Sequence, residues 1–95
     1  MPNPEPSDET ALTIFGHRVR SLREERHYSL REFAVKTGIH RSHLSRIELG
    51  RVSVTLDTLL CLAHALDIEA SQLLRPLDTR RELYRPSLLL DSRVF

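Results

Sequence analysis

A helix start signal in the stretch "HYSLREFAV" constrains the fold more tightly than any other local feature of the chain. Ser29 stands three residues before Glu32, the spacing of a capping box in which each side chain bonds the other residue's backbone N–H group. Tyr28 and Phe33 flank the box, and their spacing allows a hydrophobic staple that fixes how the chain enters the helix. The signal predicts a helix that begins at Leu30.

Two glycines divide the residues that follow. Gly38 ends the first helix at residue 37, because glycine accepts the left-handed conformation that a helix C-terminus often needs. Only Ile39 and His40 separate this end from a second helix, predicted over residues 41–49, and Gly50 ends that helix in turn. The pattern predicts two short helices joined by a tight turn.

Apolar residues spaced three and four apart predict three further helices, over residues 12–26, 56–66 and 69–75. Thr55 is the expected N-cap of the second of these, and Pro76 is expected to end the third. The helix over 56–66 is expected to bury one apolar stripe, formed by Leu56, Leu59, Leu60, Ala63 and Leu66. Since no strand signal or internal repeat is present, the sequence predicts an all-α fold of five helices.

The length of 95 residues fits one small domain with tails. Residues 1–10 hold three prolines and three acidic residues, and we expect a disordered acidic leader there. The domain itself is expected over residues 11–76, followed by an extension over 77–95. No apolar run is long enough to cross a membrane. The single cysteine, Cys61, excludes an internal disulfide and is typical of a reducing cytoplasm.

Positive charge is concentrated in one part of the chain, although the net charge is only +1. Residues 17–51 contain nine Lys or Arg and four acidic residues, a local charge of +5. A local basic surface attracts a polyanion more effectively than the overall charge suggests. The charge distribution therefore favours a contact with a polyanion near the paired short helices.

The two short helices and their "TGIH" turn form a helix-turn-helix motif. Ile39, Leu44 and Ile47 are the apolar residues that hold the second helix against the domain. The opposite face of that helix carries Arg41, Ser42, Ser45 and Arg46. A helix that presents its N-terminus and one polar face has the shape that a DNA major groove accepts.

From Phe15 to about Leu74, the chain resembles the Cro/phage-repressor (xenobiotic-response-element) family of helix-turn-helix regulators. Several segments agree with that family in register: "LREFA", "TGI", "LSRIELGR" and "LLCLAHALDI". The resemblance implies a compact five-helix domain like that of lambda repressor. It also implies a cytoplasmic transcription regulator, in our interpretation a repressor, that binds double-stranded DNA at an inverted repeat as a homodimer.

The resemblance also implies roles for individual residues. Base contacts would come from Arg41, Ser42, Ser45 and Arg46. Phosphate contacts would come from Ser29, Arg31, His40, His43 and Arg51. Arg23 and Glu48 would form a structural salt bridge between the first and third helices. Three residues depart from the family pattern: Leu30 replaces a frequent glutamine, His40 replaces a usual serine or threonine cap, and Val54 replaces a frequent proline.

Other chemistry is disfavoured by the sequence. Surface arginines are often simply solvated, but that interpretation leaves the turn unexplained. His40 and His43 could bind a metal, yet no cysteine or carboxylate joins them at a suitable spacing. Cys61 can be a small apolar filler or a redox switch. No arrangement of nucleophile and base indicates an enzyme, and we expect neither a metal nor another cofactor.

The end of the chain, "SLLLDSRVF", carries apolar residues that need a surface to cover them. The candidate dimer contacts are Leu88, Leu89, Leu90, Val94 and Phe95. These residues could pack back on their own domain, form a dimerisation arm, or bind another protein. The alternative function is therefore an antitoxin-like or adaptor module whose tail binds a partner protein.

Overall fold

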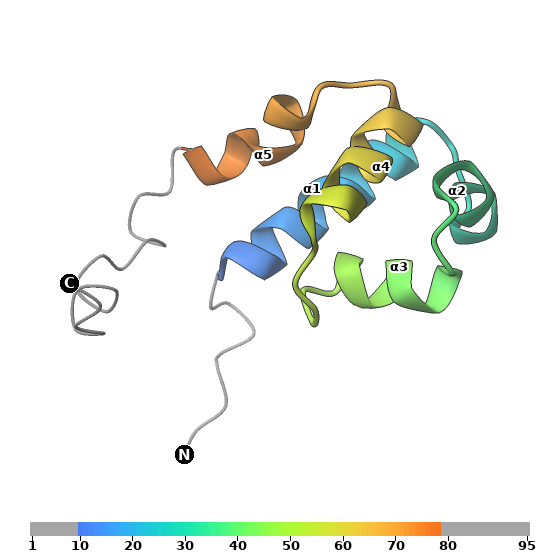
Figure 1. Ribbon diagram of the computed structural model, residues 1–95, viewed down its shortest axis with the longest axis horizontal. Helices are drawn as coiled ribbons and strands as arrows, with labels where there is room; N and C mark the ends of the chain where they lie inside the picture. Colours follow the sequence, from blue (N-terminus) through green and yellow to red (C-terminus); the bar gives the residue numbers. More distant parts are fainter. Residues whose placement is uncertain (1–9, 79–95) are drawn as a thin grey trace, which may run out of the picture.

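The computed structural model describes residues 10–78, which form five α-helices and no strands (Figure 1). The helices are α1 (Ala11–Glu25), α2 (Leu30–Thr37), α3 (Arg41–Glu48), α4 (Leu56–Leu66) and α5 (Ala70–Asp78). The all-α prediction is confirmed, and the helix bounds agree with the predicted ranges to within one residue except at the end of α5. Residues 1–9 of the predicted leader over 1–10 and residues 79–95 of the predicted extension over 77–95 lie outside the described residues.

Side-chain caps set the starts of the helices. The Ser29 hydroxyl accepts a hydrogen bond from the Glu32 backbone N–H at 3.0 Å, and the Glu32 carboxylate accepts one from the Ser29 N–H at 2.8 Å. The rings of Tyr28 and Phe33 stack beside this box with 6.3 Å between their centroids. Thr55 accepts a hydrogen bond from the Thr58 N–H at 3.1 Å in the same way. The predicted capping box, staple and Thr55 cap are therefore confirmed.

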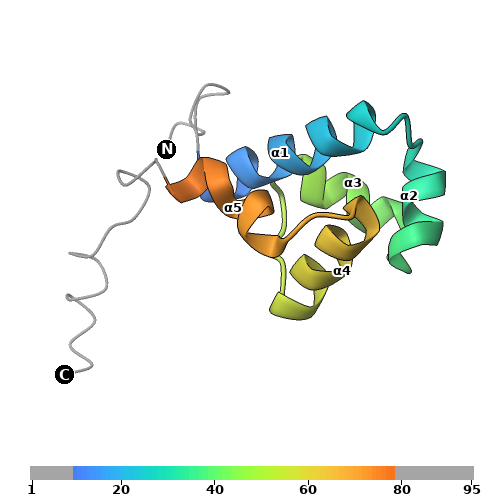
Figure 2. The ribbon, with the colours of Figure 1, turned by 90° about the horizontal axis from the view of Figure 1, so that it is seen from above.

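The core lies where α1 packs against α3 and α5 and where α2 packs against α3 and α4 (Figure 2). Its buried side chains come from all five helices. They are Phe15, Val19, Leu22, Phe33, Leu44, Ile47, Leu59, Leu62, Ala63, Leu66 and Leu73. Leu44 and Ile47 are buried as predicted, so α3 is held by its apolar side and turns its polar side outward.

The predicted buried stripe of α4 is partly wrong. Leu56 and Leu60 are 69% and 51% exposed, whereas Leu62 is fully buried. The buried face instead follows Leu59, Leu62, Ala63 and Leu66. The segment is apolar on nearly every side, and apolar spacing alone therefore fits more than one rotation of the helix.

The prediction that Pro76 ends the last helix is also wrong, because α5 continues through it to Asp78. Proline has no N–H group and cannot bond the carbonyl oxygen four residues earlier. That oxygen, on Gln72, instead accepts two hydrogen bonds from Arg18 of α1, at 3.2 Å from Nε and 3.0 Å from Nη2. A tertiary contact thus satisfies the acceptor that the proline leaves without its usual helical donor.

Candidate nucleic-acid interface

The turn between α2 and α3 has the geometry that its sequence predicts. Gly38 adopts a left-handed conformation, with φ of 75°, and its N–H donates a hydrogen bond to the Ala34 carbonyl at 2.8 Å. The Thr37 hydroxyl accepts a hydrogen bond from the Ile39 N–H at 3.0 Å. These bonds close the turn without help from solvent, and they fix the direction in which α3 leaves α2.

The first turn of α3 is capped by an imidazole. Nδ1 of His40 accepts a hydrogen bond from the Ser42 N–H at 3.1 Å and lies 2.9 Å from the Ser42 hydroxyl oxygen. His40 therefore replaces the usual hydroxyl cap, and the Ser42 hydroxyl is already engaged inside the protein.

The outward face of α3 carries two arginines with unused hydrogen-bonding capacity. Arg41 and Arg46 are exposed, and neither guanidinium group forms a hydrogen bond or ion pair with another residue in the range 10–78. Ser42 is exposed as well, while His43 and Ser45 are half-buried. Each guanidinium group can therefore offer its full set of donors to an external acceptor.

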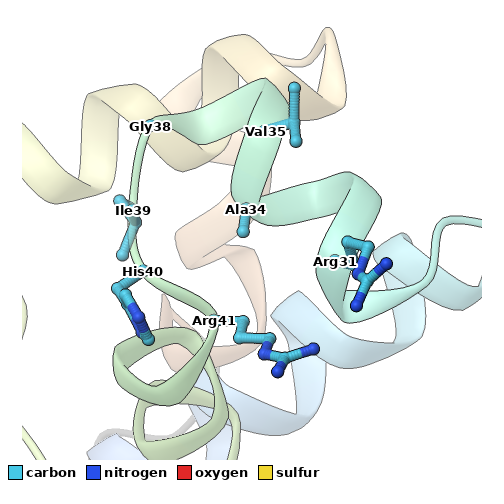
Figure 3. Close-up of a pocket in the computed structure, with 7 residues that line it drawn as sticks. All are labelled: Arg31, Ala34, Val35, Gly38, Ile39, His40 and Arg41. Carbon is cyan, nitrogen blue, oxygen red and sulfur yellow. The ribbon is translucent and has the colours of Figure 1, made fainter.

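An open hollow lies between α2 and the start of α3 (Figure 3). It has a volume of about 540 Å³ and combines basic groups with an apolar floor. Its lining residues are Arg31, Ala34, Val35, Gly38, Ile39, His40 and Arg41. Figure 3 shows the guanidinium groups of Arg31, from α2, and Arg41, from α3, on the same side of the hollow. The hollow thus offers two cations to one anion.

The remaining candidate phosphate contacts occupy the two ends of the paired helices. Ser29 is exposed at the start of α2, although its hydroxyl serves as the N-cap. Arg51 is exposed beyond the far end of α3, where its backbone N–H donates a hydrogen bond to the Arg46 carbonyl at 2.9 Å. The candidates therefore form two groups, one beside the hollow and one after α3. Leu88, Leu89, Leu90, Val94 and Phe95 lie outside the described residues.

A buried ion pair holds α3 against α1. Arg23 Nε lies 2.7 Å from Glu48 Oε2, and Arg23 Nη2 donates to Glu48 Oε1 at 3.0 Å. The third guanidinium nitrogen donates to the Tyr28 carbonyl at 2.8 Å, so the same side chain also fixes the approach to α2. The hydrogen bond to Glu48 raises the pKa of Arg23 above its ordinary value, so the guanidinium group stays protonated. This network fixes the position of the polar face from behind.

Gly16 is a second link between α1 and α3, one that the sequence analysis did not identify. A Cβ atom at this position would lie 2.5 Å from the carbonyl oxygens of both Ile47 and Glu48. Only a residue without a side chain permits this approach. A glycine inside an otherwise helical pattern is the signal that could have found it, because such glycines often mark close backbone contacts.

The described residues offer neither a cluster of metal ligands nor a membrane-spanning helix. No group of three or more His, Cys, Asp or Glu residues in the range 10–78 could hold a metal ion. None of the helices there is long and apolar enough to cross a membrane.

Comparisons with known proteins agree with this geometry. The family model HTH_3, which describes a helix-turn-helix, matches residues 19–73. The chain is 40% identical to the restriction-modification controller protein C.AhdI from Aeromonas hydrophila, with a TM-score of 0.64 and coverage of 65% of this chain and 94% of that one. The structure of the clp gene regulator ClgR from Corynebacterium glutamicum is 26% identical, with a TM-score of 0.71 and coverage of 90% of each chain.

A longer relative shares only part of its length with this chain. The HTH-type transcriptional regulatory protein PH1808 of Pyrococcus horikoshii is 34% identical over 91 residues, which cover 88% of this chain and 28% of that protein. The shared part contains the helix-turn-helix. The family model, the relatives and the fold thus agree, and the chain belongs to the HTH_3 family of helix-turn-helix, DNA-binding transcription regulators, which are not enzymes.

Proposed function

We propose that this protein reads a specific DNA sequence by inserting α3 into the major groove, and that it acts as a repressor. The observation that carries the proposal is the pair of exposed arginines on α3, Arg41 and Arg46, whose guanidinium groups have no partner among the described residues. Their helix is fixed from behind by the Arg23–Glu48 ion pair. A rigid helix with free donors is what direct reading of base edges requires.

We assign sequence reading to the outward face of α3. Arg41 and Arg46 can each donate two hydrogen bonds to O6 and N7 of a guanine. Ser42 and Ser45 supply shorter contacts to neighbouring base edges. Since the Ser42 hydroxyl already bonds His40, its contribution is smaller than that of the arginines.

Phosphate binding would position α3 in the groove. The hollow beside Arg31 and Arg41 is open and basic, and it lies between α2 and the N-terminus of α3, where backbone N–H groups favour an anion. His40 lines the same hollow, and we assign further phosphate contacts to Ser29 and His43. Arg51 would hold a second phosphate beyond α3. These contacts supply affinity that falls with added salt.

The chain would bind as a homodimer to an inverted repeat. Two copies related by a two-fold axis place two recognition helices about 34 Å apart, one helical turn of DNA. A repressor acts when it occupies a DNA site that overlaps a promoter. DNA binding alone is therefore sufficient for repression. The tail from residue 79 remains a candidate dimer arm.

Selection of binding sites from random duplex DNA tests this proposal directly. The wild-type chain should enrich an inverted repeat with half-sites one helical turn apart. Arg46→Ala should then lower discrimination between the selected site and random DNA by about 1–3 kcal/mol, the value of one bidentate guanine contact. Arg75→Ala is the matched control, because Arg75 is an exposed arginine on α5.

Two outcomes would contradict the proposal. An equal loss of affinity for all sequences in Arg46→Ala would make Arg46 a phosphate contact. The absence of any enriched site, with only salt-sensitive binding, would favour the adaptor alternative over sequence reading.

A further inference from the structure

Two exposed arginines lie together at the C-terminal end of α3. Arg46 is in the last turn of the helix, and Arg51 follows it after a short turn. The Arg51 N–H donates a hydrogen bond to the Arg46 carbonyl at 2.9 Å, which fixes the two residues relative to each other. Neither guanidinium group has a hydrogen bond or ion pair with another residue in the range 10–78. We call these two residues the α3 end pair.

The first turn of α1 packs against the same end of α3. Gly50 directly precedes Arg51, and a Cβ atom at Gly50 would lie 2.7 Å from both Cα and Cγ2 of Thr13 in α1. In Figure 1, the start of α1 and the loop that follows α3 lie next to each other at the lower edge of the molecule. The start of α1 is therefore held beside the α3 end pair.

A capping box fixes the point at which the chain enters α1. The Thr13 N–H donates a hydrogen bond to the Thr10 hydroxyl at 3.2 Å, and the Thr10 N–H donates one to the Thr13 hydroxyl at 3.0 Å. Thr13 thus closes the box and also contacts Gly50. Whatever its own conformation, the segment that precedes Thr10 is tethered beside the α3 end pair.

That segment, residues 1–9, is complementary in charge to the α3 end pair. It contains no Lys or Arg and three acidic residues, Glu5, Asp8 and Glu9. A chain spans at most about 3.6 Å per residue, so Asp8 stays within about 7 Å of Thr10 and Glu5 within about 18 Å. Such a short tether keeps the carboxylates at a high effective concentration near the two guanidinium groups.

Other arginines of the domain are poorer partners for these carboxylates. The arginines of α1 already donate hydrogen bonds to oxygen atoms of the domain: Arg18, Arg20, Arg23 and Arg26. Arg41 is free, but it begins α3 and so lies at the end of that helix opposite the α3 end pair. The α3 end pair is therefore the free basic group beside the tether.

We infer that residues 1–9 bind the α3 end pair when DNA is absent, and that they compete with DNA for these two arginines. The inference rests on the proposed function, in which Arg46 reads a base and Arg51 holds a phosphate. DNA must displace the carboxylates before α3 can enter the groove. Exposed ion pairs are individually weak and are screened by salt, so the competition is modest and acts mainly at low salt.

Nuclear magnetic resonance of the full chain without DNA tests the contact. The variant Asp8→Asn/Glu9→Gln should shift the Nε–H signals of Arg46 and Arg51, because two carboxylates no longer bind there. About 1 M NaCl should shift the same two signals of the wild type in the same direction, since screening then limits exposed charges to about 3 Å. Arg75, exposed on α5, is the internal control, and its Nε–H signal should not respond to the variant.

Fluorescence anisotropy with a short random DNA duplex tests the competition. At low salt, Asp8→Asn/Glu9→Gln should bind about five-fold more tightly than the wild type, because two exposed ion pairs no longer have to be broken. The gain should disappear at high salt.

The matched control is Asp67→Asn/Glu69→Gln, which makes the same change in net charge. Asp67 and Glu69 are exposed in the turn between α4 and α5, which lies at the upper edge of Figure 1, opposite α3. Asparagine tolerates the left-handed conformation of residue 67, so the control variant should stay folded. Its affinity for the random duplex should rise by at most about two-fold, because distant exposed charges are screened.

Two results would overturn the inference: Arg46 and Arg51 signals that do not respond to Asp8→Asn/Glu9→Gln, or an affinity of this variant no higher than that of the control. A lower free energy of unfolding in the variant, with those signals unmoved, would instead assign the two acids to the helix dipole of α1. Because the duplex is random, neither assay depends on sequence reading. Competition by residues 1–9 in a chain that selects no DNA site would support the inference and refute the proposed function.

Discussion

Replacing Gly16 by alanine tests the close approach of α1 and α3. The new Cβ atom would lie 2.5 Å from two carbonyl oxygens of α3, those of Ile47 and Glu48. An ordinary carbon–oxygen contact is about 3.3 Å or longer. The helices would therefore have to separate by roughly 0.8 Å at this point to reach that distance. Because the opposing atoms are backbone, no rotamer change relieves the contact.

The expected loss follows from two opposing effects. Overpacking costs about 1–3 kcal/mol, and a contact with rigid backbone belongs at the upper end of that range. Alanine in a helix is favoured over glycine by about 1 kcal/mol, which offsets part of this cost. We expect Gly16→Ala to lower the free energy of unfolding by about 2 kcal/mol net. Small domains of this size have only about 3–10 kcal/mol in total.

Urea unfolding followed by circular dichroism measures this change. The midpoint should fall while the slope m stays the same, because one added methyl group hardly changes how much surface unfolding exposes. Gly38→Ala is the comparison: nothing lies within 4 Å of its added Cβ, so its loss should be the cost of a positive φ, about 1 kcal/mol. A Gly16→Ala variant as stable as the wild type would refute the tight α1–α3 contact.

Three further changes separate stability from DNA binding. Glu48→Gln should lower the free energy of unfolding by about 3 kcal/mol, because it leaves the buried charge of Arg23 without its carboxylate. A loss well below about 1 kcal/mol in urea unfolding would contradict the stabilising role of the Arg23–Glu48 ion pair. Thr55→Ala removes the acceptor for the Thr58 N–H and should cost about 1 kcal/mol in the same assay while DNA affinity, measured by fluorescence anisotropy, stays unchanged. Arg31→Ala should weaken binding to all DNA sequences alike and reduce the slope of log affinity against log salt concentration by about 1. A loss of affinity confined to one DNA sequence would instead make Arg31 a base contact.

Local signals in the sequence predicted much of this fold correctly. The Ser29 capping box, the Gly38 turn and the Thr55 cap depend on residues within a few positions of one another, so their chemistry can be recognised without the tertiary structure. The spacing of Leu44 and Ile47 likewise determined which side of α3 faces outward. The candidate site rests largely on these local features.

The errors arose where distant residues decide the outcome. Leu60 and Leu62 are chemically alike, and only the packing of α4 against the other helices selects which is buried. The close approach at Gly16 depends on α3, thirty residues away in the chain. The unused guanidinium groups of Arg41 and Arg46 could be identified only once the neighbouring side chains were placed. Leu56 and Leu60 were assigned to the core for the same reason.

The contact between Arg18 and the Gln72 carbonyl has a consequence for the order in which the domain assembles. The last turn of α5 contains Pro76, and it relies on a donor from α1, 54 residues earlier. A turn that needs a distant partner cannot form while the chain is still open, because loop closure must come first. The amide protons of this turn should therefore exchange with solvent sooner than those in the middle of α1, and they report when the first and last described helices have met.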